Sequence, residues 1–358
     1  MQGSKVKMKM SFVFAVVILF SLPIIVRSDD AIPADKAQLG SWFDKQLAVK
    51  KPMAMGGGGP PKVIRVGIGG QFKTVTEAIT SIPVGNAQRV VVSIAPGNYT
   101  EKITIPSDKP FVTLYGDPKN MPVLAFAGTA AKYGTVDSAT LTVESEHFMG
   151  VNLKVVNSAP RPDGKRVGAQ ASAVRVGGDA SVFYNCKFYG YQDTVFDYKG
   201  RHLFKDCYIE GTVDFIFGSA RSLYLNCEIH VIPGDGNAII TAHARNDAKE
   251  DTGFSFVHCS ISGTAPNAVL GRSWFPYPRV VFALCDISNV IIPEGWSNNF
   301  HPETNSTVYF GEFNNRGPGA NMEKRVTFAK KLTPAEANPF ITLAYIEAST
   351  WLLPPARI

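Results

Sequence analysis

The chain has 358 residues, of which 45% are hydrophobic and 18% are charged, which is enough apolar material for one sizeable core. The formal net charge is +6, but residues 1–28 carry four cations and no acid, so the rest of the chain carries only +2. This weak basic balance and the lack of any nucleic-acid-binding motif in the sequence argue against a nucleic acid partner.

The N-terminus has the pattern of a secretory signal peptide. Three lysines precede the apolar run Phe12–Val26, and Val26-Arg27-Ser28 offers a small-residue cleavage site. The run is short for a membrane span, so we expect residues 1–28 to be removed and the protein to be secreted without a membrane partner. Residues 29–61 are expected to hold a short helix around Ala37–Ala48 and a flexible linker rich in glycine and proline.

The remaining residues, 62–358, are expected to be mostly strands. Apolar residues at helical spacing predict one helix, at Thr74–Ile82. Short runs rich in β-branched and aromatic residues predict strands at Arg89–Ile94, Phe111–Tyr115, Leu141–Val143 and Ala173–Val176.

Farther along the chain, a short motif occurs five times. Each copy has a large aromatic residue, two further residues, a cysteine, one residue and an apolar residue. The copies are Phe183/Cys186/Phe188, Phe204/Cys207/Ile209, Tyr224/Cys227/Ile229, Phe256/Cys259/Ile261 and Phe282/Cys285/Ile287. The cysteines follow one another at steps of 21, 20, 32 and 26 residues, which is typical of a strand solenoid with loop insertions. We predict an all-β fold, a single-stranded right-handed parallel β-helix over residues 62–358, with a β-sandwich as the alternative.

The five cysteines occupy one position of the repeat and should stack as a ladder. Neighbouring rungs lie within reach of a disulfide, and secretion permits one, although five cysteines leave at least one thiol unpaired. Buried free thiols are the equal alternative. Two sequons for N-glycosylation begin at Asn98 and Asn305, and the polar surroundings of Asn305 make it the better candidate.

Two aspartates lie at equal offsets within this repeat. Asp193 and Asp214 each come seven residues after a cysteine, so their carboxylates should be neighbours on adjacent coils. Two like charges that are close together cannot both ionise easily, so one pKa rises. The carboxyl with the raised pKa can serve as an acid, while the ionised carboxylate can act as a nucleophile.

Four further side chains complement this pair. The amides of Gln170 and Gln192 can donate hydrogen bonds to an oxyanion, Arg272 offers a fork for a carboxylate, and Trp274 offers a flat surface for a sugar ring. Each residue has an ordinary structural alternative, as a turn or ladder residue, an ion-pair partner or a core residue. Their joint presence in one solenoid favours catalysis.

At this point the chain resembles the plant-type pectin methylesterase (pectinesterase) family, from about Lys62 to near the C-terminus. The resemblance rests on five short sequence motifs, which occur in the same order as in the family. They are Gly97-Asn-Tyr-Thr-Glu101, Gln170-Ala-Ser-Ala-Val-Arg175, Gly190-Tyr-Gln-Asp-Thr194, Gly211-Thr-Val-Asp-Phe-Ile-Phe-Gly218 and Leu270-Gly-Arg-Ser-Trp274. The helical inhibitor-like prodomain of many plant members is not expected, because residues 29–61 are too few.

The resemblance implies a β-helical enzyme of the plant cell wall that removes methyl esters from pectin and needs no cofactor or metal. By motif, Asp214 is the nucleophile, and Gln170 and Gln192 stabilise the oxyanion. Asp193 protonates the departing methanol and then deprotonates the hydrolytic water.

The family pattern also implies binding residues and partners. Arg272, Trp274 and Thr140 match residues that bind substrate, and Gln170 also contacts it. Cys207 and Cys227 match a family disulfide, which favours that bridge. Pectin is the expected substrate, a proteinaceous inhibitor is a candidate partner, and a monomer is expected.

The sequence departs from the family at three positions near these motifs. Ser273 replaces a proline, Ser172 replaces an apolar residue, and His243 replaces a glutamine and is expected at the surface or in the groove. The alternatives to an esterase are a lyase or polygalacturonase on the same solenoid, and a wall-binding protein without catalysis. The amide donors favour ester chemistry, and the intact catalytic set argues against a non-catalytic protein.

Overall fold

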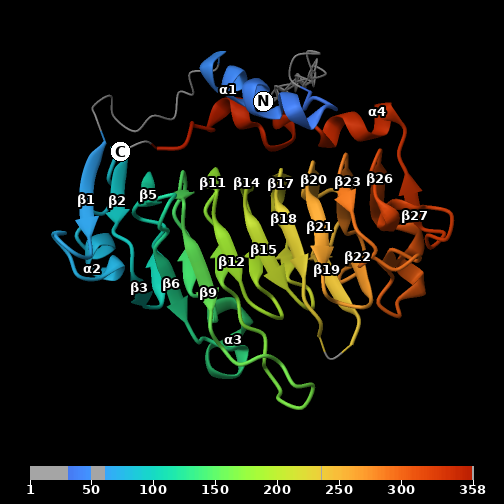
Figure 1. The fold of residues 1–358 in the computed structure, drawn as a ribbon, viewed down its shortest axis with the longest axis horizontal. Helices are drawn as coiled ribbons and strands as arrows, with labels where there is room; N and C mark the ends of the chain where they lie inside the picture. Colours follow the sequence, from blue (N-terminus) through green and yellow to red (C-terminus); the bar gives the residue numbers. More distant parts are fainter. Residues whose placement is uncertain (1–30, 50–60, 235, 357–358) are drawn as a thin grey trace, which may run out of the picture.

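The computed structural model describes residues 31–49, 61–234 and 236–356. The expected signal peptide and nearly all of the expected linker lie outside the described residues. The described chain forms three parallel sheets whose strands are wound in successive coils (Figure 1). No helix in these segments is long and apolar enough to span a bilayer.

One sheet has eleven strands, and the other two have eight each. The eleven-stranded sheet consists of β1 (Lys62–Val66), β2 (Val90–Ile94), β5 (Val112–Gly116), β8 (Met149–Val151), β11 (Ser181–Tyr184), β14 (Arg201–Lys205), β17 (Arg221–Leu225), β20 (Gly253–Val257), β23 (Arg279–Ala283), β26 (Tyr309–Phe313) and β27 (Ala329–Lys331). The second sheet, called the groove sheet below, consists of β4 (Ile103–Ile105), β7 (Leu141–Val143), β10 (Val174–Val176), β13 (Val195–Asp197), β16 (Ile216–Gly218), β19 (Ala238–His243), β22 (Ala268–Arg272) and β25 (Trp296–Ser297). The third sheet consists of β3 (Asn98–Thr100), β6 (Val123–Phe126), β9 (Lys154–Asn157), β12 (Lys187–Tyr189), β15 (Tyr208–Gly211), β18 (Glu228–Val231), β21 (Ser260–Gly263) and β24 (Asp286–Ile287).

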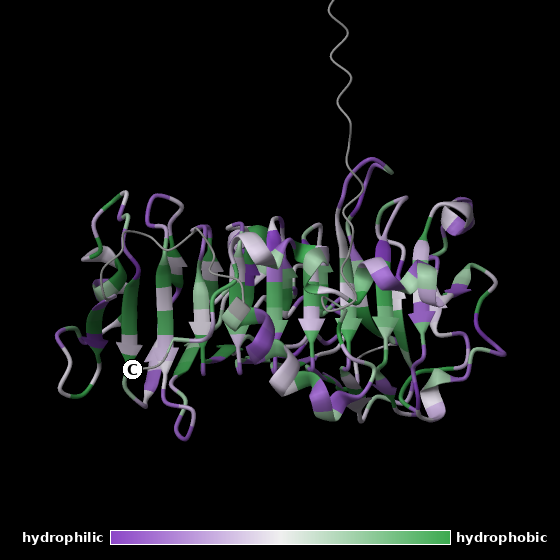
Figure 2. Ribbon diagram, turned by 90° about the horizontal axis from the view of Figure 1, so that it is seen from above, coloured by the Kyte–Doolittle hydropathy of each residue, from purple (hydrophilic) through white to green (hydrophobic). Residues whose placement is uncertain are grey.

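The strand register confirms the repeat that the sequence predicted. Phe183 pairs with Phe204, Phe204 with Tyr224, and Tyr224 with Phe256, each on the next coil. Their rings stack at centroid distances of 5.1, 4.7 and 4.4 Å, and Figure 2 shows hydrophobic residues concentrated in the strands. Parallel pairing of neighbouring coils confirms the parallel β-helix and rules out the antiparallel sheets of a β-sandwich.

A left-handed residue precedes each cysteine of the repeat and turns the chain from the eleven-stranded sheet into the third sheet. Asn185, Asp206 and Asn226 have φ values of 50°, 56° and 55° at these corners. Asparagine and aspartate tolerate this conformation better than most residues. The Asn226 amide also donates a 2.6 Å hydrogen bond to Asp206, so the corner residues stack on one another.

The cysteine ladder forms, but the expected Cys207–Cys227 disulfide does not. All five cysteines are buried free thiols, as in the alternative that the sequence left open. The Cys207 thiol donates to the carbonyl of Phe183 at 3.5 Å and the Cys227 thiol donates to that of Phe204 at 3.3 Å. The sulfurs of Cys207 and Cys227 therefore each have a backbone acceptor on the preceding coil and fill the core without a bridge.

Helices lie outside the coils. The helix predicted over Thr74–Ile82 is α2 (Val75–Thr80), which begins with a capping box between Thr74 and Glu77. Helix α3 (Ala130–Asp137) was not predicted, because it carries Gly134 at a φ of 74° and has little apolar periodicity. The others are η2 (Lys36–Gln38), α1 (Leu39–Val49), η3 (Pro302–Ser306), η4 (Pro318–Ala320), α4 (Pro334–Ala337), η5 (Asn338–Phe340), η6 (Leu343–Ile346) and η7 (Ala348–Thr350).

The N-terminal helix and the C-terminal segment together cover the outer face of the eleven-stranded sheet (Figure 1). The helices η2 and α1 confirm the short helix expected around Ala37–Ala48. Ile32 donates its amide to Ile341 at 2.9 Å, and Phe43 packs edge-on against Tyr184. This cover protects one face of the solenoid, while α3 projects on the opposite side beside the groove sheet.

Candidate active site

Asp193 and Asp214 lie at corresponding turns, just before β13 and β16 of the groove sheet. Both have left-handed backbones, with φ values of 68° and 49°. The Asp193 amide donates to the carbonyl of Val213 at 3.1 Å, so the two turns are held in register on adjacent coils. Unusual backbone conformations of this kind cluster at functional sites, where the surrounding structure enforces them.

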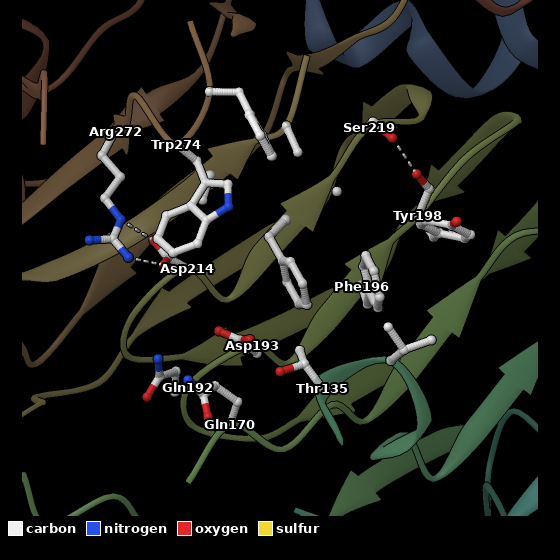
Figure 3. A pocket seen from close by; sticks show the side chains of 16 residues that line it. Thr135, Gln170, Gln192, Asp193, Phe196, Tyr198, Asp214, Ser219, Arg272 and Trp274 are labelled. Carbon is white, nitrogen blue, oxygen red and sulfur yellow. Dashed lines mark hydrogen bonds and ion pairs between the residues drawn. The ribbon is translucent and has the colours of Figure 1, made fainter. Parts of the chain in front are cut away.

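Both carboxylates face one pocket with a volume of about 440 Å³ (Figure 3). The pocket crosses five coils, because its lining comes from the segments around β10, β13, β16, β19 and β22. It gathers the predicted residues Gln170, Gln192, Asp193, Asp214, Arg272 and Trp274. The structure therefore brings together six residues that are spread over about a hundred positions of the sequence.

Arg272, at the end of β22, binds the carboxylate of Asp214. Its Nε donates to Oδ1 at 2.8 Å and its Nη2 donates to Oδ2, which is a bidentate ion pair. The remaining Nη1 donates to Asn299 at 2.9 Å, and the guanidinium lies 4.9 Å from the centroid of the Trp274 ring. The sequence suggested that Arg272 binds a carboxylate of the substrate. In the structure its guanidinium binds the carboxylate of Asp214 instead.

The two carboxyl groups differ in their environment. Burial raises the pKa of Asp193 well above its ordinary value, and the negative charge of Asp214 raises it further. Burial also raises the pKa of Asp214, but the hydrogen bonds and charge of Arg272 oppose this rise. Only Asp214 is paired with the guanidinium. When the two carboxyl groups together hold one proton, that proton is therefore on Asp193 and the negative charge is on Asp214.

Gln170 and Gln192 line the same side of the pocket as Asp193 (Figure 3). The Ala171 amide donates to the carbonyl of Gln192 at 3.2 Å, which places the two glutamines at matching turns of adjacent coils. Both side chains are half-buried. Two amide groups beside two carboxylates provide donors where an ester oxygen would develop negative charge.

Two aromatic residues that were not predicted from the sequence also line the pocket. Phe196 and Phe217 pair across β13 and β16, and their rings stack at 4.4 Å with an interplanar angle of 9°. Each comes three residues after a catalytic candidate, Asp193 or Asp214, so the offset that revealed the aspartates could also have revealed these rings. They give the pocket an apolar wall beside its charged centre.

Thr140 is not a pocket residue, so the expectation that it contacts substrate is not supported. Its side chain is fully buried, and the hydroxyl donates to the carbonyl of Val156 at 2.9 Å. Thr135, near the end of α3, lines the pocket instead, next to Val136. Helix α3, which was not predicted from the sequence, thus places a threonine in the pocket.

All three departures from the family pattern are buried, and Ser172 is fully so. Ser273 is 1% exposed, and its amide donates to the carbonyl of Ser297 at 3.0 Å, a bond that a proline could not make. His243 is not the surface or groove residue that was expected. It is fully buried, accepts a 3.2 Å hydrogen bond from the Arg279 amide, and burial lowers its pKa to about 3.

Comparisons with known proteins agree with this geometry. The Pectinesterase family model matches residues 63–349. Pectinesterase 1 of Olea europaea is 57% identical over 349 residues, covering 94% of this chain and 95% of the relative, and the pectinesterase of Parthenium hysterophorus matches equally well. Among solved structures, the pectin methylesterase from carrot is 32% identical with a TM-score of 0.76, covering 84% of this chain and 98% of its own.

A second solved structure, a pectin methylesterase in complex with a hexasaccharide, is 26% identical with a TM-score of 0.70. It covers 84% of this chain and all of its own. The matches extend over the whole solenoid, including both aspartate turns and the Arg272 strand. The chain therefore belongs to the pectinesterase family and is a carboxylic ester hydrolase.

Proposed function

We propose that this enzyme hydrolyses the methyl ester at C6 of galacturonate units in pectin and releases methanol and a free carboxylate. The observation that carries the proposal is the pair Asp193 and Asp214, which share one pocket although only Asp214 is held by a guanidinium. This asymmetry supplies an acid and a nucleophile at the same pH.

In the first half of the reaction, an oxygen of Asp214 attacks the ester carbonyl carbon and forms a tetrahedral intermediate. The side-chain amides of Gln170 and Gln192 donate hydrogen bonds to its oxyanion. When the intermediate collapses, the bond to the methoxy group breaks and Asp193 transfers its proton to that oxygen. Methanol leaves, and the substrate carboxyl remains bound to Asp214 as an anhydride.

In the second half, the ionised Asp193 removes a proton from water, and the resulting hydroxide attacks the C6 carbonyl carbon of the anhydride. The same glutamines stabilise the second oxyanion. Collapse breaks the bond to Asp214, which returns as a carboxylate, and Asp193 holds its proton again. The sum is one ester and one water converted into one acid and one methanol.

Arg272 orients Asp214 rather than blocking it. A carboxylate oxygen has two lone pairs, so an oxygen that accepts a hydrogen bond from the guanidinium keeps another lone pair for attack. The same guanidinium supports the face of Trp274, which is 52% exposed. We assign Trp274 to stacking against the sugar ring whose ester enters the pocket.

Several expectations from the sequence belong to the same proposal. The protein acts outside the cell, in plant cell-wall modification, as a monomer, and a proteinaceous inhibitor is a candidate partner. Both sequons are candidates for glycosylation. Asn98 is exposed on β3, whereas Asn305 is half-buried in η3 and accepts a 3.0 Å hydrogen bond from Asn298, so the structure favours Asn98.

The test is an incubation of the purified secreted protein with highly methylated pectin, in which methanol, new carboxylate and polymer length are measured together. The proposal expects methanol and carboxylate in equal amounts with no shortening of the chains. Chain shortening without methanol would instead indicate glycosidic cleavage, and no change in either quantity would indicate a binding protein.

A further inference from the structure

The most exposed large hydrophobic side chain among the described residues belongs to Phe300, which is 96% exposed. It lies in the turn after β25, the groove-sheet strand next to β22. An aromatic ring loses favourable burial when it is held in water, so a ring presented in this way indicates a contact made by something else.

The backbone of this turn is strained and firmly held. Asn299 and Phe300 have consecutive φ values of 56° and 62°, a conformation that is unusual for a residue as bulky as phenylalanine. The Asn299 amide donates to Ser297 Oγ at 3.0 Å, and the Phe300 amide donates to Asn298 Oδ1 at 3.2 Å. Strain that the surrounding bonds maintain is characteristic of binding and catalytic sites.

The turn is connected directly to the catalytic centre. Asn299 Oδ1 accepts a 2.9 Å hydrogen bond from Nη1 of Arg272, whose other donors hold the nucleophile Asp214. Arg272 also pairs in register with Ser297, at the start of the turn. The position of Phe300 is therefore set by the arginine that sets the position of the nucleophile.

We propose that Phe300 forms an outer subsite on which a sugar ring of the polymer stacks while another unit of the chain presents its ester to Asp214. This inference rests on the proposed function. β25 is three strands from β16 in the groove sheet, which is roughly 14 Å at the spacing of neighbouring strands. A polysaccharide that lies across the coils spans this distance with a few units, whereas a very short oligomer centred on Asp214 does not.

The charges around the ring specify the type of unit that binds there. Residues 297–306 contain no lysine or arginine, and they include Glu303, whose pKa is lowered by backbone hydrogen bonding and by His301. Arg272, the cation that bonds to this turn, is already engaged by Asp214 and Asn299. His301 is paired with Glu303 at 2.9 Å, so a free galacturonate would find no unpaired cation within residues 297–306, and the subsite favours a methyl-esterified unit.

The first test compares Phe300→Ala with the wild type on highly methylated pectin and on a methylated digalacturonate. With the polymer, the KM of the variant should rise by about two- to tenfold, the range expected for one aromatic contact, with kcat unchanged. With the short substrate the two proteins should have equal kinetics, and Phe300→Tyr should retain the wild-type KM. Equal kinetics of wild type and Phe300→Ala on the polymer would overturn the proposal.

A second variant separates binding from folding. Phe300→Gly removes the ring but also relieves the left-handed strain, since glycine adopts this conformation freely. We expect its Tm to match or exceed that of the wild type while its KM for the polymer rises as in Phe300→Ala. A lower Tm together with losses on both substrates would mean that the ring is structural, and the subsite would be abandoned.

A binding measurement keeps the subsite separate from the catalytic proposal. Affinity for highly methylated pectin is compared between Asp214→Asn and the double variant Asp214→Asn/Phe300→Ala. The subsite predicts weaker binding by the double variant, and a smaller difference with de-esterified pectin. If the wild type released no methanol, the proposed function would fail, yet this comparison would still decide the subsite: equal affinities of the two variants would refute it.

Discussion

The guanidinium of Arg272 binds both carboxylate oxygens of Asp214, one of them at 2.8 Å. Asp193 faces the same pocket and is affected by Arg272 only through its charge. Two chemically identical side chains on adjacent coils thereby differ in how strongly they hold a proton. Their roles follow from a residue that lies about sixty positions farther along the chain.

Removing this guanidinium should shift the pH dependence of the enzyme. Arg272 lowers the pKa of Asp214, so in Arg272→Ala that pKa rises and the carboxylate becomes protonated at higher pH. The acidic limb of kcat/KM should move upward by about one to three pH units. The measurement is kcat/KM for methanol release as a function of pH in both proteins.

The matched control is Arg272→Lys, which keeps a positive charge but loses the bidentate geometry. It should shift the acidic limb less than Arg272→Ala while still lowering kcat, because the lysine cannot hold both oxygens. An acidic limb that stayed at the wild-type position in Arg272→Ala would mean that it reports a group other than Asp214.

Asp193 should be a stability liability at neutral pH. Its pKa in the folded protein lies above the ordinary value of 3.8, so the folded state loses stability as the pH rises above that value toward the folded pKa. Asp193→Asn cannot ionise, and asparagine tolerates the left-handed backbone. The variant should therefore have a Tm higher by a few degrees at neutral pH, on the order of what 1 kcal/mol gives in a protein of this size.

The same variant should lose most of its activity, by about a hundredfold or more, because it has no proton to give to methanol. The Tm advantage should vanish when the pH falls below the ordinary carboxyl value, where Asp193 is protonated in both the folded and the unfolded state. Thermal unfolding of the wild type and Asp193→Asn from pH 3 to pH 8 tests this, and a constant Tm difference across the range would contradict it.

The two glutamines should affect the chemical step more than substrate binding. Gln170→Ala and Gln192→Ala each remove a donor to the oxyanion, so kcat should fall by about 10²- to 10³-fold with little change in KM. Gln38→Ala is the control, since Gln38 is exposed in η2 on the covered face of the molecule. The measurement is kcat and KM for methanol release by each variant. A change in KM alone would mean that the glutamines bind the substrate in its ground state.

The cysteine ladder should contain five free thiols. Alkylation of the denatured protein without reductant, followed by mass measurement, should label all five cysteines. In the folded protein the labelling should be slow, because burial raises the pKa of Cys207 and Cys227 well above its ordinary value. Labelling of three cysteines in the denatured protein would instead support the bridge between these two.

The solenoid and the centre of the site could be predicted because a repeat converts sequence offsets into positions in space. The equal spacing of Asp193 and Asp214 from a cysteine predicts that the two carboxylates lie on adjacent coils. The same register stacks Phe183 on Phe204 and Phe196 on Phe217. Features that repeat from coil to coil can therefore be predicted from the sequence.

Features that depend on insertions into the repeat, or on contacts between residues far apart in the chain, could not be predicted from the sequence. Helix α3 lies outside the repeat and carries Gly134, so the pocket residue Thr135 could not be predicted from the repeat. His243 is buried on β19 and packs edge-on at 4.6 Å against Phe254 of the eleven-stranded sheet, a contact between sheets that the local sequence does not indicate. The cover on the outer face joins the N-terminal and C-terminal segments of the described chain, as in the 2.9 Å hydrogen bond from the Ile32 amide to the carbonyl of Ile341.

Methanol release from methylated pectin by the wild type, Asp214→Asn and Asp206→Asn tests the central claim most directly. Asp206 is the matched control, an aspartate with a φ of 56° at a coil corner that is not part of the pocket. We expect Asp214→Asn to lose activity by more than about a thousandfold and Asp206→Asn to stay near the wild type. Substantial methanol release by a folded Asp214→Asn protein would contradict the assignment of Asp214 as the nucleophile.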